Sequence, residues 1–141
     1  MIGDEIDVQT WLVDELVLIV APGHNLARKK TVNKIDLEKE KFVLRESGSA
    51  TRATIIDYLQ DCGLKLQTVM EMENPESLKK AVQSGLGIAF ISKFAVESEL
   101  KAKALVTPRI SGFKINRDLK IVYRKDKHLS RAARTFIEMA Q

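Results

Sequence analysis

Continuous runs of hydrophobic residues mark the strands that the sequence predicts. The run Leu16–Val20 (LVLIV) is apolar throughout and rich in β-branched residues, which is typical of a strand buried on both faces. Phe42–Arg45 and Ile88–Ile91 are shorter runs of the same kind. Gln67–Met72 (QTVMEM) alternates polar and apolar residues, as a strand with one solvent-exposed face does. Two further strands are predicted, at Ala104–Thr107 and Leu119–Arg124.

Apolar residues at helical spacing, together with capping residues, predict the helices. Ile55, Ile56 and Leu59 share one face of a helix over Ala50–Cys62, which Gly63 ends. The other helices begin at recognisable caps. They are a helix from Pro75 to Gly85 with Asn74 as its cap and Glu76 in its first turn, and a helix over Lys93–Leu100 with Ser92 as a candidate cap. A last helix is capped by Ser130, with a predicted buried stripe of Ala133, Phe136, Ile137 and Ala140.

Strands and helices alternate between residues 42 and 100, which predicts an α/β fold with a mostly parallel sheet. In such sheets ligands bind beyond the carboxyl ends of the strands, where the following helices begin. Polar turns rich in capping residues stand at three such places, namely Ser47–Thr51, Asn74–Glu76 and Ser92. We therefore expect these turns to meet at one edge of the sheet.

The stretch Phe42–Leu59 (FVLRESGSATRATIIDYL) passes from a strand into a helix through small polar residues. Within it, Ser47–Thr51 brings backbone N–H groups and hydroxyl groups to a helix N-terminus, where the first four N–H groups lack intrahelical partners. This arrangement predicts a binding place for a negative charge. The alternative is that Ser49 only caps the helix. Glu46 beside the turn disfavours a highly charged anion, and Arg52 either approaches the anion or points to solvent.

The composition is that of a soluble globular protein, with 45% hydrophobic and 30% charged residues among 141. No apolar stretch approaches the roughly 20 residues that a membrane-spanning helix needs, and Met1–Thr10 is acidic, unlike a signal peptide. A single cysteine excludes an internal disulfide and favours a reducing, cytoplasmic location. The formal net charge is +4, but the basic residues are dispersed. We therefore interpret the charge as a solvated surface and not as a nucleic-acid-binding face.

Motifs for catalysis and for cofactor binding are missing from the sequence. Ser47 and Ser49 lack the glycine framing of a nucleophile elbow, and His24 and His128 are expected to be solvated loop histidines. Two histidines and one cysteine without short spacing argue against a metal site, and Cys62 is expected to be a packing residue. The Gly-x-Gly of SGLGIAF runs from helix into strand, the reverse of a dinucleotide-binding turn, so its role is structural. The sequence therefore predicts no enzyme, no cofactor and no metal.

Four segments resemble the effector-binding domain of LysR-type transcriptional regulators, in the family's order and spacing. They are Asp14–Ala27 (DELVLIVAPGHNLA), Phe42–Arg52 (FVLRESGSATR), Glu76–Ser92 (ESLKKAVQSGLGIAFIS) and Leu119–Glu138 (LKIVYRKDKHLSRAARTFIE), of which the middle two are the more specific. The resemblance implies a fold like that of type II periplasmic solute-binding proteins. In that fold two α/β lobes, joined by two crossing strands, hold a small effector between them. The loop rich in arginine, serine and glycine resembles the branch that controls sulphur, nitrogen or carbon assimilation.

The resemblance also implies how the chain is divided into one complete lobe and a remnant of the other. Residues 26–118 correspond to the effector-binding lobe, which is the family's second regulatory lobe. Residues 1–25 correspond to a first-lobe remnant and the crossover strand, and residues 119–141 to the return strand and C-terminal helix of the first lobe. The family's helix-turn-helix, its linker helix and the early first lobe are missing. We therefore expect a fragment, truncated at its N-terminus, that binds DNA only through the missing domain.

Effectors of the family are small and mostly anionic metabolites, which polar turns of both lobes contact. Carried onto this sequence, the resemblance assigns effector binding to Ser47, Gly48, Ser49 and Thr51 and, as weaker candidates, to Asn74, Pro75 and Glu76. The uncovered surface of the first lobe predicts self-association as a dimer or higher oligomer. Family dimers are expected to use the helix Ala50–Cys62 and the strand Gln67–Met72. No membrane partner is expected.

Two other interpretations stay open beside that of a bacterial ligand sensor. A lobe of a solute-binding protein has the same fold and a transport role, and the lack of a signal peptide weighs against it. An enzyme on a similar fold, such as a prephenate dehydratase-like domain, would need a polar catalytic cluster. The sequence offers no such cluster.

Overall fold

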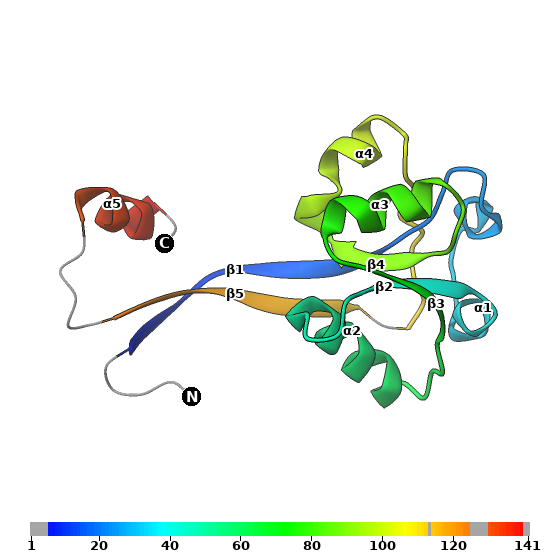
Figure 1. The fold of residues 1–141 in the computed structure, drawn as a ribbon, viewed down its shortest axis with the longest axis horizontal. Helices are drawn as coiled ribbons and strands as arrows, with labels where there is room; N and C mark the ends of the chain where they lie inside the picture. The colour runs from blue at the N-terminus through cyan, green and yellow to red at the C-terminus, as the bar shows by residue number, and fades with distance from the viewer. Residues whose placement is uncertain (1–5, 113, 125–129, 140–141) are drawn as a thin grey trace. The chain divides into compact units, whose positions relative to one another are not determined.

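A computed structural model describes residues 6–112, 114–124 and 130–139 of the chain (Figure 1). The strands are β1 (Ile6–Ile19), β2 (Lys41–Arg45), β3 (Gln67–Met72), β4 (Ala89–Ser92) and β5 (Ile115–Arg124). The α-helices are α1 (Lys34–Glu38), α2 (Ala50–Asp61), α3 (Pro75–Gln83), α4 (Glu97–Lys101) and α5 (Arg131–Met139). Short 3-10 helices are η1 (Asn25–Arg28) and η2 (Lys93–Ala95). The fold is therefore mixed α/β, as predicted.

The larger of two compact units, Glu15–Ile115, is built around a sheet in which β2 and β3 run parallel. Ile88, just before β4, extends this sheet in a parallel bridge to β2. Its carbonyl accepts a hydrogen bond from the Val43 N–H at 2.9 Å, and its N–H donates to the Lys41 carbonyl at 2.9 Å. On the far side of β4, β1 runs antiparallel. The predicted parallel arrangement is thus confirmed for β3, β2 and the bridge before β4, whereas β1 is antiparallel to β4.

Hydrophobic side chains alternate between the two faces of this sheet. Phe42, Ile88 and Phe90 belong to the cluster on the α2 side, where the rings of Phe42 and Phe90 stack with centroids 6.1 Å apart. Val43 and Ile91 belong to the cluster on the opposite face, which α3 covers (Figure 1). The helices complete the two clusters with Ile55 and Leu59 from α2 and with Leu78, Ala81 and Val82 from α3. Strands buried on both faces make this unit a three-layer sandwich.

Gly87 lets the chain pass close to β2 on its way from α3 into β4. A Cβ atom at this position would lie 2.6 Å from the carbonyl oxygen of Lys41 and 3.2 Å from Cγ2 of Val43. No side chain fits there unless the strand moves. Gly85, with a φ of 80°, allows the chain to leave α3. Both glycines serve the fold, as the sequence predicted.

Two predicted elements of the larger unit differ in the structure. The predicted strand Ala104–Thr107 is wrong, because pairing in this fully described segment is limited to one bridge between Val106 and Val20. The predicted helix Lys93–Leu100 is divided into η2 and α4 at Val96. Val96 is completely buried and has a φ of −122°. Its backbone therefore lies outside the helical region, at the point where η2 ends and α4 begins.

β1 begins at Ile6, ten residues before the predicted start at Leu16. Its first part mixes polar and apolar residues and is mostly half-buried, so no continuous apolar run marks it in the sequence. This first part belongs to the smaller unit, Met1–Asp14 with Asn116–Gln141, together with α5 and most of β5. β1 and β5 are neighbours in one sheet.

Polar side chains join β1 to β5 within the smaller unit. Asp14 is completely buried and accepts a hydrogen bond from Arg117 Nε at 3.1 Å. Tyr123 Oη donates to Asp7 Oδ2 at 2.9 Å. This hydrogen bond raises the pKa of the Tyr123 phenol, because it stabilises the protonated form.

The buried stripe predicted for α5 is wrong for its described residues, none of which is buried. Phe136 is 52% exposed, and its ring meets that of Trp11 with centroids 5.8 Å apart. Ala140, the last residue of the predicted stripe, lies outside the described residues. The predicted cap is confirmed, since Ser130 Oγ accepts from the Ala133 N–H at 3.1 Å.

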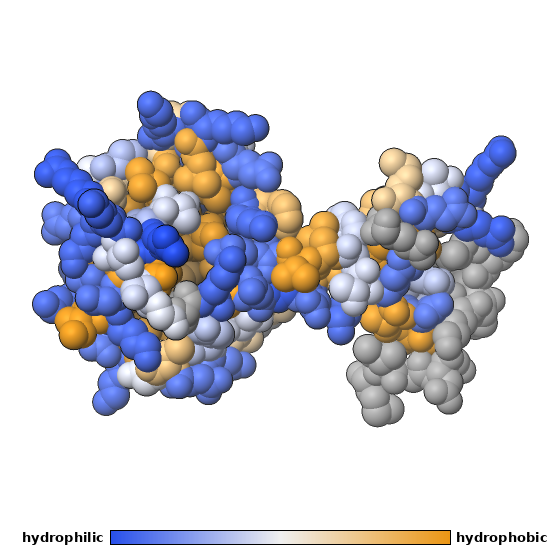
Figure 2. Space-filling view, turned by 180° about the vertical axis from the view of Figure 1, so that it is seen from behind, coloured by the Kyte–Doolittle hydropathy of each residue, from blue (hydrophilic) through white to orange (hydrophobic). Residues whose placement is uncertain are grey.

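Large hydrophobic side chains are exposed on the smaller unit, and hydrophobic surface is visible in Figure 2. They are Trp11, Val13, Val122, Phe136 and Met139. Exposed apolar surface of this kind is typical of regions that another protein segment or a second chain covers.

Candidate functional site

The turns that follow β2 and β3 lie side by side at one edge of the sheet, because both parallel strands end there. The Glu46 N–H donates to the Met72 carbonyl at 3.1 Å, and Arg45 Nη2 donates to the Glu73 carbonyl at 3.3 Å. The bridge before β4 is also parallel to β2, so the end of β4 at Ser92 faces the same edge (Figure 1). The structure thus brings together the turns that the sequence placed at this edge.

The first turn, Ser47–Thr51, leads from β2 into α2. Gly48 has a φ of 96°, a left-handed conformation that glycine adopts without strain. Ser49 caps α2, since its Oγ accepts a hydrogen bond from the Arg52 N–H at 3.3 Å. Accepting this bond leaves the hydroxyl proton of Ser49 available as a donor. The predicted cap is confirmed, and contact of Ser49 with an effector stays a prediction.

The remaining side chains of this turn differ in exposure. Ser47 is exposed, whereas Thr51 is half-buried in the first turn of α2 and interacts with other protein groups. α2 has 12 residues, so its N-terminus carries a partial positive charge at the turn. The turn therefore presents hydroxyl groups, the backbone N–H groups around Gly48 and a helix dipole to the space beyond the sheet.

Arg52 links the ends of β2 and β3. Its Nη1 donates to the Arg45 carbonyl at 2.8 Å and to Glu71 Oε1 at 2.6 Å. The side chain is 24% exposed, and that of Glu71 is 51% exposed. Sequence reasoning offered an anion or solvent as the partner of Arg52, and the structure shows a third arrangement, an ion pair with the neighbouring strand.

Arg45 and Glu46 form a second ion pair in this turn. Arg45 Nε lies 3.0 Å from Glu46 Oε2, and Arg45 Nη2 lies 3.1 Å from Glu46 Oε1. These hydrogen bonds from Arg45, helped by the backbone N–H of Glu46, hold the pKa of the Glu46 carboxyl below its usual range. The carboxylate therefore stays ionised, and its negative charge is offset by the neighbouring guanidinium.

The second turn, at Asn74 and Glu76, is held by its own caps and ion pairs. Asn74 Oδ1 accepts from the Ser77 N–H at 2.8 Å and caps α3. Glu76 is largely exposed and lies 2.8 Å from Nζ of Lys79. Asn74 and Glu76 thus stand where the sequence predicted, and their contact with an effector stays a prediction.

Lys79, which the sequence analysis missed, fixes α3 against the segment after β4. Its Nζ donates to the Ala95 carbonyl at 2.8 Å and to Glu99 Oε1 at 2.8 Å. Burial alone would lower the pKa of Lys79, but hydrogen bonds to Glu76 and Glu99 outweigh burial and raise it. Glu76 and Lys79 are three residues apart on α3, and this spacing is the one sign of their ion pair in the sequence.

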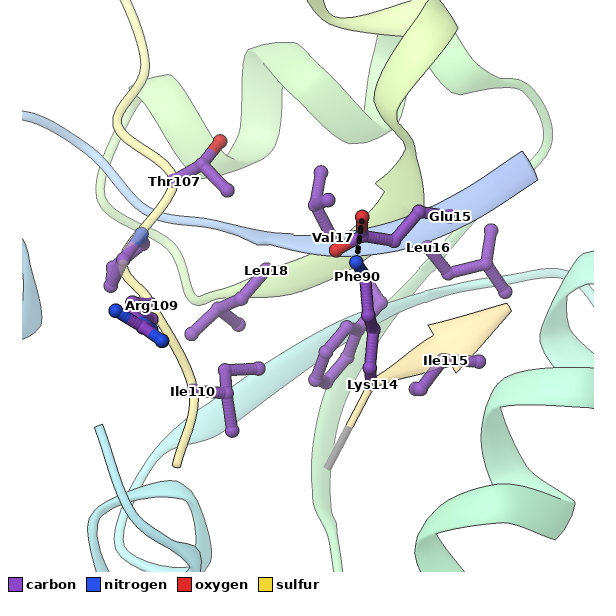
Figure 3. Close-up of a pocket in the computed structure, with 11 residues that line it drawn as sticks. Glu15, Leu16, Val17, Leu18, Phe90, Thr107, Arg109, Ile110, Lys114 and Ile115 are labelled. Carbon is purple, nitrogen blue, oxygen red and sulfur yellow. Dashed lines mark ion pairs between the residues drawn. The ribbon is translucent and has the colours of Figure 1, made fainter. Parts of the chain in front are cut away.

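A pocket of about 330 Å³ lies elsewhere in the larger unit (Figure 3). It is lined by β1 residues from Glu15 to Leu18, by Phe90 of β4, and by residues of the segment 107–115. None of the predicted site residues lines it. No local motif marks this pocket in the sequence, because its walls come from three distant parts of the chain.

Neither a metal centre nor a membrane span is found in the part of the chain that the structure describes. No group of three His, Cys, Asp or Glu side chains there could hold a metal ion, and no helix there could cross a membrane. His24 is half-buried, with Nε2 3.1 Å from Glu40 Oε2 and Nδ1 accepting from the Leu26 N–H at 3.0 Å. The prediction of a solvated loop histidine is therefore wrong for His24. His128 lies outside the described residues.

A family model described as "LysR substrate binding domain" matches residues 3–141. The "RuBisCO operon transcriptional regulator" of Allochromatium vinosum is 37% identical over 134 residues, which cover 95% of this chain and 44% of that protein. The "Uncharacterized HTH-type transcriptional regulator YeiE" of Escherichia coli K12 is 39% identical over 135 residues, covering 95% of this chain and 45% of that protein. The chain thus spans less than half the length of these relatives.

Solved structures show the same fold. The regulatory domain of CcmR from Synechocystis PCC6803, in complex with 2-PG, matches with a TM-score of 0.85 at 27% identity, covering 99% of this chain and 68% of that chain. The effector binding domain of QuiR in complex with shikimate matches with a TM-score of 0.81 at 20% identity, covering 99% of this chain and 66% of that chain. At 20% identity the likeness concerns the fold alone.

Proposed function

The chain belongs to the LysR substrate-binding domain family, and from this premise we propose which effector it senses and where. It is the effector-binding domain of a LysR-type regulator, with a periplasmic-binding-protein-like fold. We propose that its effector is a small organic acid, held at the edge where β2 and β3 end. The observation that carries the proposal is the hydrogen-bonded pairing of the turns after these strands, through Glu46 to Met72 and Arg45 to Glu73.

The charges at this edge favour an effector of modest negative charge. Arg45 is paired with Glu46 and Arg52 with Glu71, so these four side chains sum to zero. The remaining attraction comes from the N-terminus of α2 and from N–H and hydroxyl donors, which suit a carboxylate or a phosphate group. 2-PG and shikimate, which the CcmR and QuiR structures contain, are both small organic acids.

The first turn contacts the acid group of the effector through Ser47, Gly48, Ser49 and Thr51. The Ser49 N–H already donates to the Glu46 carbonyl, so Ser49 would contribute its hydroxyl group. Asn74 uses its carbonyl oxygen to cap α3, so its amide NH₂ is left to donate. The Glu76 carboxylate accepts a hydrogen bond from a hydroxyl group of the effector.

The rest of the regulator is assigned by the family. We propose that residues 26–118 form the effector-binding lobe, and that residues 1–25 and 119–141 belong to the other lobe. We propose that the regulator binds DNA through a helix-turn-helix domain, as its family does, and not through this domain. We also propose that the protein acts in the cytoplasm, and that this domain is a sensor and not an enzyme. The names of the relatives, several of them RuBisCO regulators, suit a role in carbon assimilation. A transport role as a solute-binding lobe is not favoured, because these relatives are transcriptional regulators.

Self-association through α2 and β3 is also part of the proposal. Among the described strands β3 pairs only with β2, so its other edge is open to a second chain. Ile56 and Leu66 add apolar surface between α2 and β3. Light scattering should show a dimer or a larger oligomer, and a clean monomer at high protein concentration contradicts this part of the proposal.

The effector site is tested by anion titration of thermal stability in the parent protein and in the double variant Ser47→Ala/Thr51→Ala. Millimolar sulphate, citrate or 2-phosphoglycolate should raise the melting temperature of the parent above that in chloride of equal ionic strength. The double variant should lose this increase. Ser98→Ala, on the exposed surface of α4, serves as the control and should keep it.

Ser49→Ala separates capping from binding. It should cost about 1 kcal/mol of stability in either case, because the cap of α2 is lost. The proposal fails if the double variant is stabilised by these anions as much as the parent, since Ser49 is then only a cap.

A further inference from the structure

Arg45 holds its guanidinium group beyond the carboxyl ends of both parallel strands. It is the last residue of β2, in register with Met72, the last residue of β3. Its Nη2 donates to the carbonyl of Glu73, the first residue after β3, at 3.3 Å. The guanidinium group therefore stands between the two turns that are proposed to hold the effector, and a hydrogen bond to the backbone keeps it there.

The Glu46 carboxylate occupies one edge of this guanidinium group. Both of its oxygens accept hydrogen bonds, from Arg45 Nε at 3.0 Å and from Arg45 Nη2 at 3.1 Å. Arginine recognises the carboxylate or phosphate group of a ligand in the same paired geometry. These bonds are the chief cause of the lowered pKa of Glu46, and the charge of Arg52 adds to the lowering, so a second cation lies close by. Glu46 thus fills a place that suits the acid group of a ligand.

The two partners of this ion pair differ in how firmly they are held. The Arg45 side chain is 22% exposed and is anchored by the Glu73 carbonyl. The Glu46 side chain is 40% exposed, and Arg45 is the one described cation with which it forms an ion pair. The Glu46 N–H donates to the Met72 carbonyl, so the side chain can turn into water while its backbone stays in place. A partly exposed pair contributes little to stability, so another carboxylate can replace Glu46.

We propose that Glu46 determines specificity at the effector site, as an internal competitor that occupies Arg45 until an acid group of the effector replaces it. This inference rests on the proposed binding of a small acid at this edge. A ligand must displace a carboxylate that is always present, so a neutral ligand does not gain access to Arg45. After the exchange the charge of Glu46 remains nearby, which disfavours effectors that carry many negative charges.

The test is NMR titration with 2-phosphoglycolate, at constant ionic strength, of the parent, Glu46→Gln and Glu71→Gln. Glu46→Gln should bind the acid about fivefold more tightly, as expected when a competing, partly exposed ion pair is removed. Glu71→Gln is the matched control, because it changes the net charge equally and frees Arg52, but Glu71 lies within β3 and not beyond its end. It should change the affinity less than about twofold. In the parent, the Arg45 Nε–H signal should shift as the acid is added, because its acceptor changes.

A second pair of variants shows whether the tighter binding requires Arg45. Arg45→Gln weakens binding partly by cutting the bond to Glu73, but adding Glu46→Gln to it should not increase the affinity. The inference alone is overturned if the parent binds the acid and Glu46→Gln binds it no more tightly, if Glu71→Gln binds as tightly as Glu46→Gln, or if Glu46→Gln increases the affinity in the absence of Arg45. If neither the parent nor Glu46→Gln binds the acid, while both keep the melting temperature of the unliganded parent, the proposed effector site fails as well.

Discussion

Lys79→Met tests whether a buried ammonium group holds α3 against the segment after β4. Lys79 is 5% exposed, and its Nζ contacts the Ala95 carbonyl, Glu99 and Glu76, each at 2.8 Å. Three acceptors match the three protons of the ammonium group. Methionine keeps the apolar stem and removes the ammonium group, so the substitution removes both ion pairs and the hydrogen bond to the Ala95 carbonyl.

The magnitude follows from the exposure of the two carboxylates. Breaking a buried pair by removing one partner costs about 3–5 kcal/mol, because the other charge is left uncompensated. The Glu99 side chain is 15% exposed and loses its partner, whereas Glu76 is 78% exposed and gains water in exchange. Partial exposure of Glu99 reduces the cost, and we expect the free energy of unfolding to fall by about 2–3 kcal/mol.

The assay is urea unfolding at neutral pH, with Lys80→Met on the exposed side of α3 as the control. Adding Glu99→Gln to Lys79→Met should restore more than half of the loss, because the one unpaired charge that remains, on Glu76, is exposed to water. Since the pKa of Lys79 is raised in the fold, its stabilising contribution is complete below the unfolded pKa of about 10.4 and is lost as the pH rises through the folded pKa. A loss for Lys79→Met within about 0.5 kcal/mol of that for Lys80→Met refutes the reasoning.

Three further predictions concern single positions. Gly87→Ala should lower the free energy of unfolding by about 2 kcal/mol, because the new Cβ would lie 2.6 Å from a backbone carbonyl of β2. Gly23→Ala is the control in the same urea unfolding, and should change the midpoint little because the space around its Cβ is open. The hydrogen bond from the Asn33 N–H is the chief cause that lowers the pKa of Asp36. The Asp36 carboxylate should therefore stabilise α1 above about pH 4, and this stabilisation should be lost as the pH falls through the folded pKa, which carboxyl NMR titration measures. The Tyr123 phenol should ionise above about pH 10 in an ultraviolet titration, because it donates to a carboxylate of β1.

Sequence patterns predicted the parts of the fold that depend on neighbouring residues. The caps at Ser49, Asn74 and Ser130 are confirmed, because a capping side chain bonds to an N–H only a few residues away. The buried runs that became β2 and β4 were also visible, since strands covered on both faces are apolar throughout. Local rules therefore carried the α/β order and the three turns at the edge of the sheet.

Features that depend on distant residues were missed. The start of β1 is stabilised by pairing with β5, more than a hundred residues later, as the Asp7 to Tyr123 bond illustrates. Arg52 finds Glu71 only because β2 and β3 are adjacent in the sheet. Val96, which is completely buried, has a non-helical backbone and interrupts a helix that its neighbours favour. Such contacts are set by tertiary packing, which a single sequence does not display.

The bonds that join the turns after β2 and β3 have a consequence for the entropy of ligand binding. The Glu46 to Met72 and Arg45 to Glu73 hydrogen bonds fix two segments that would otherwise have to be ordered when a ligand arrives. The conformational entropy of these segments is already lost on folding, so less entropy is lost on binding and the affinity is higher. If the effector binds at this edge, as proposed, a substitution that cuts either bond should weaken binding by loosening the unliganded turns, even where every atom that touches the ligand is unchanged.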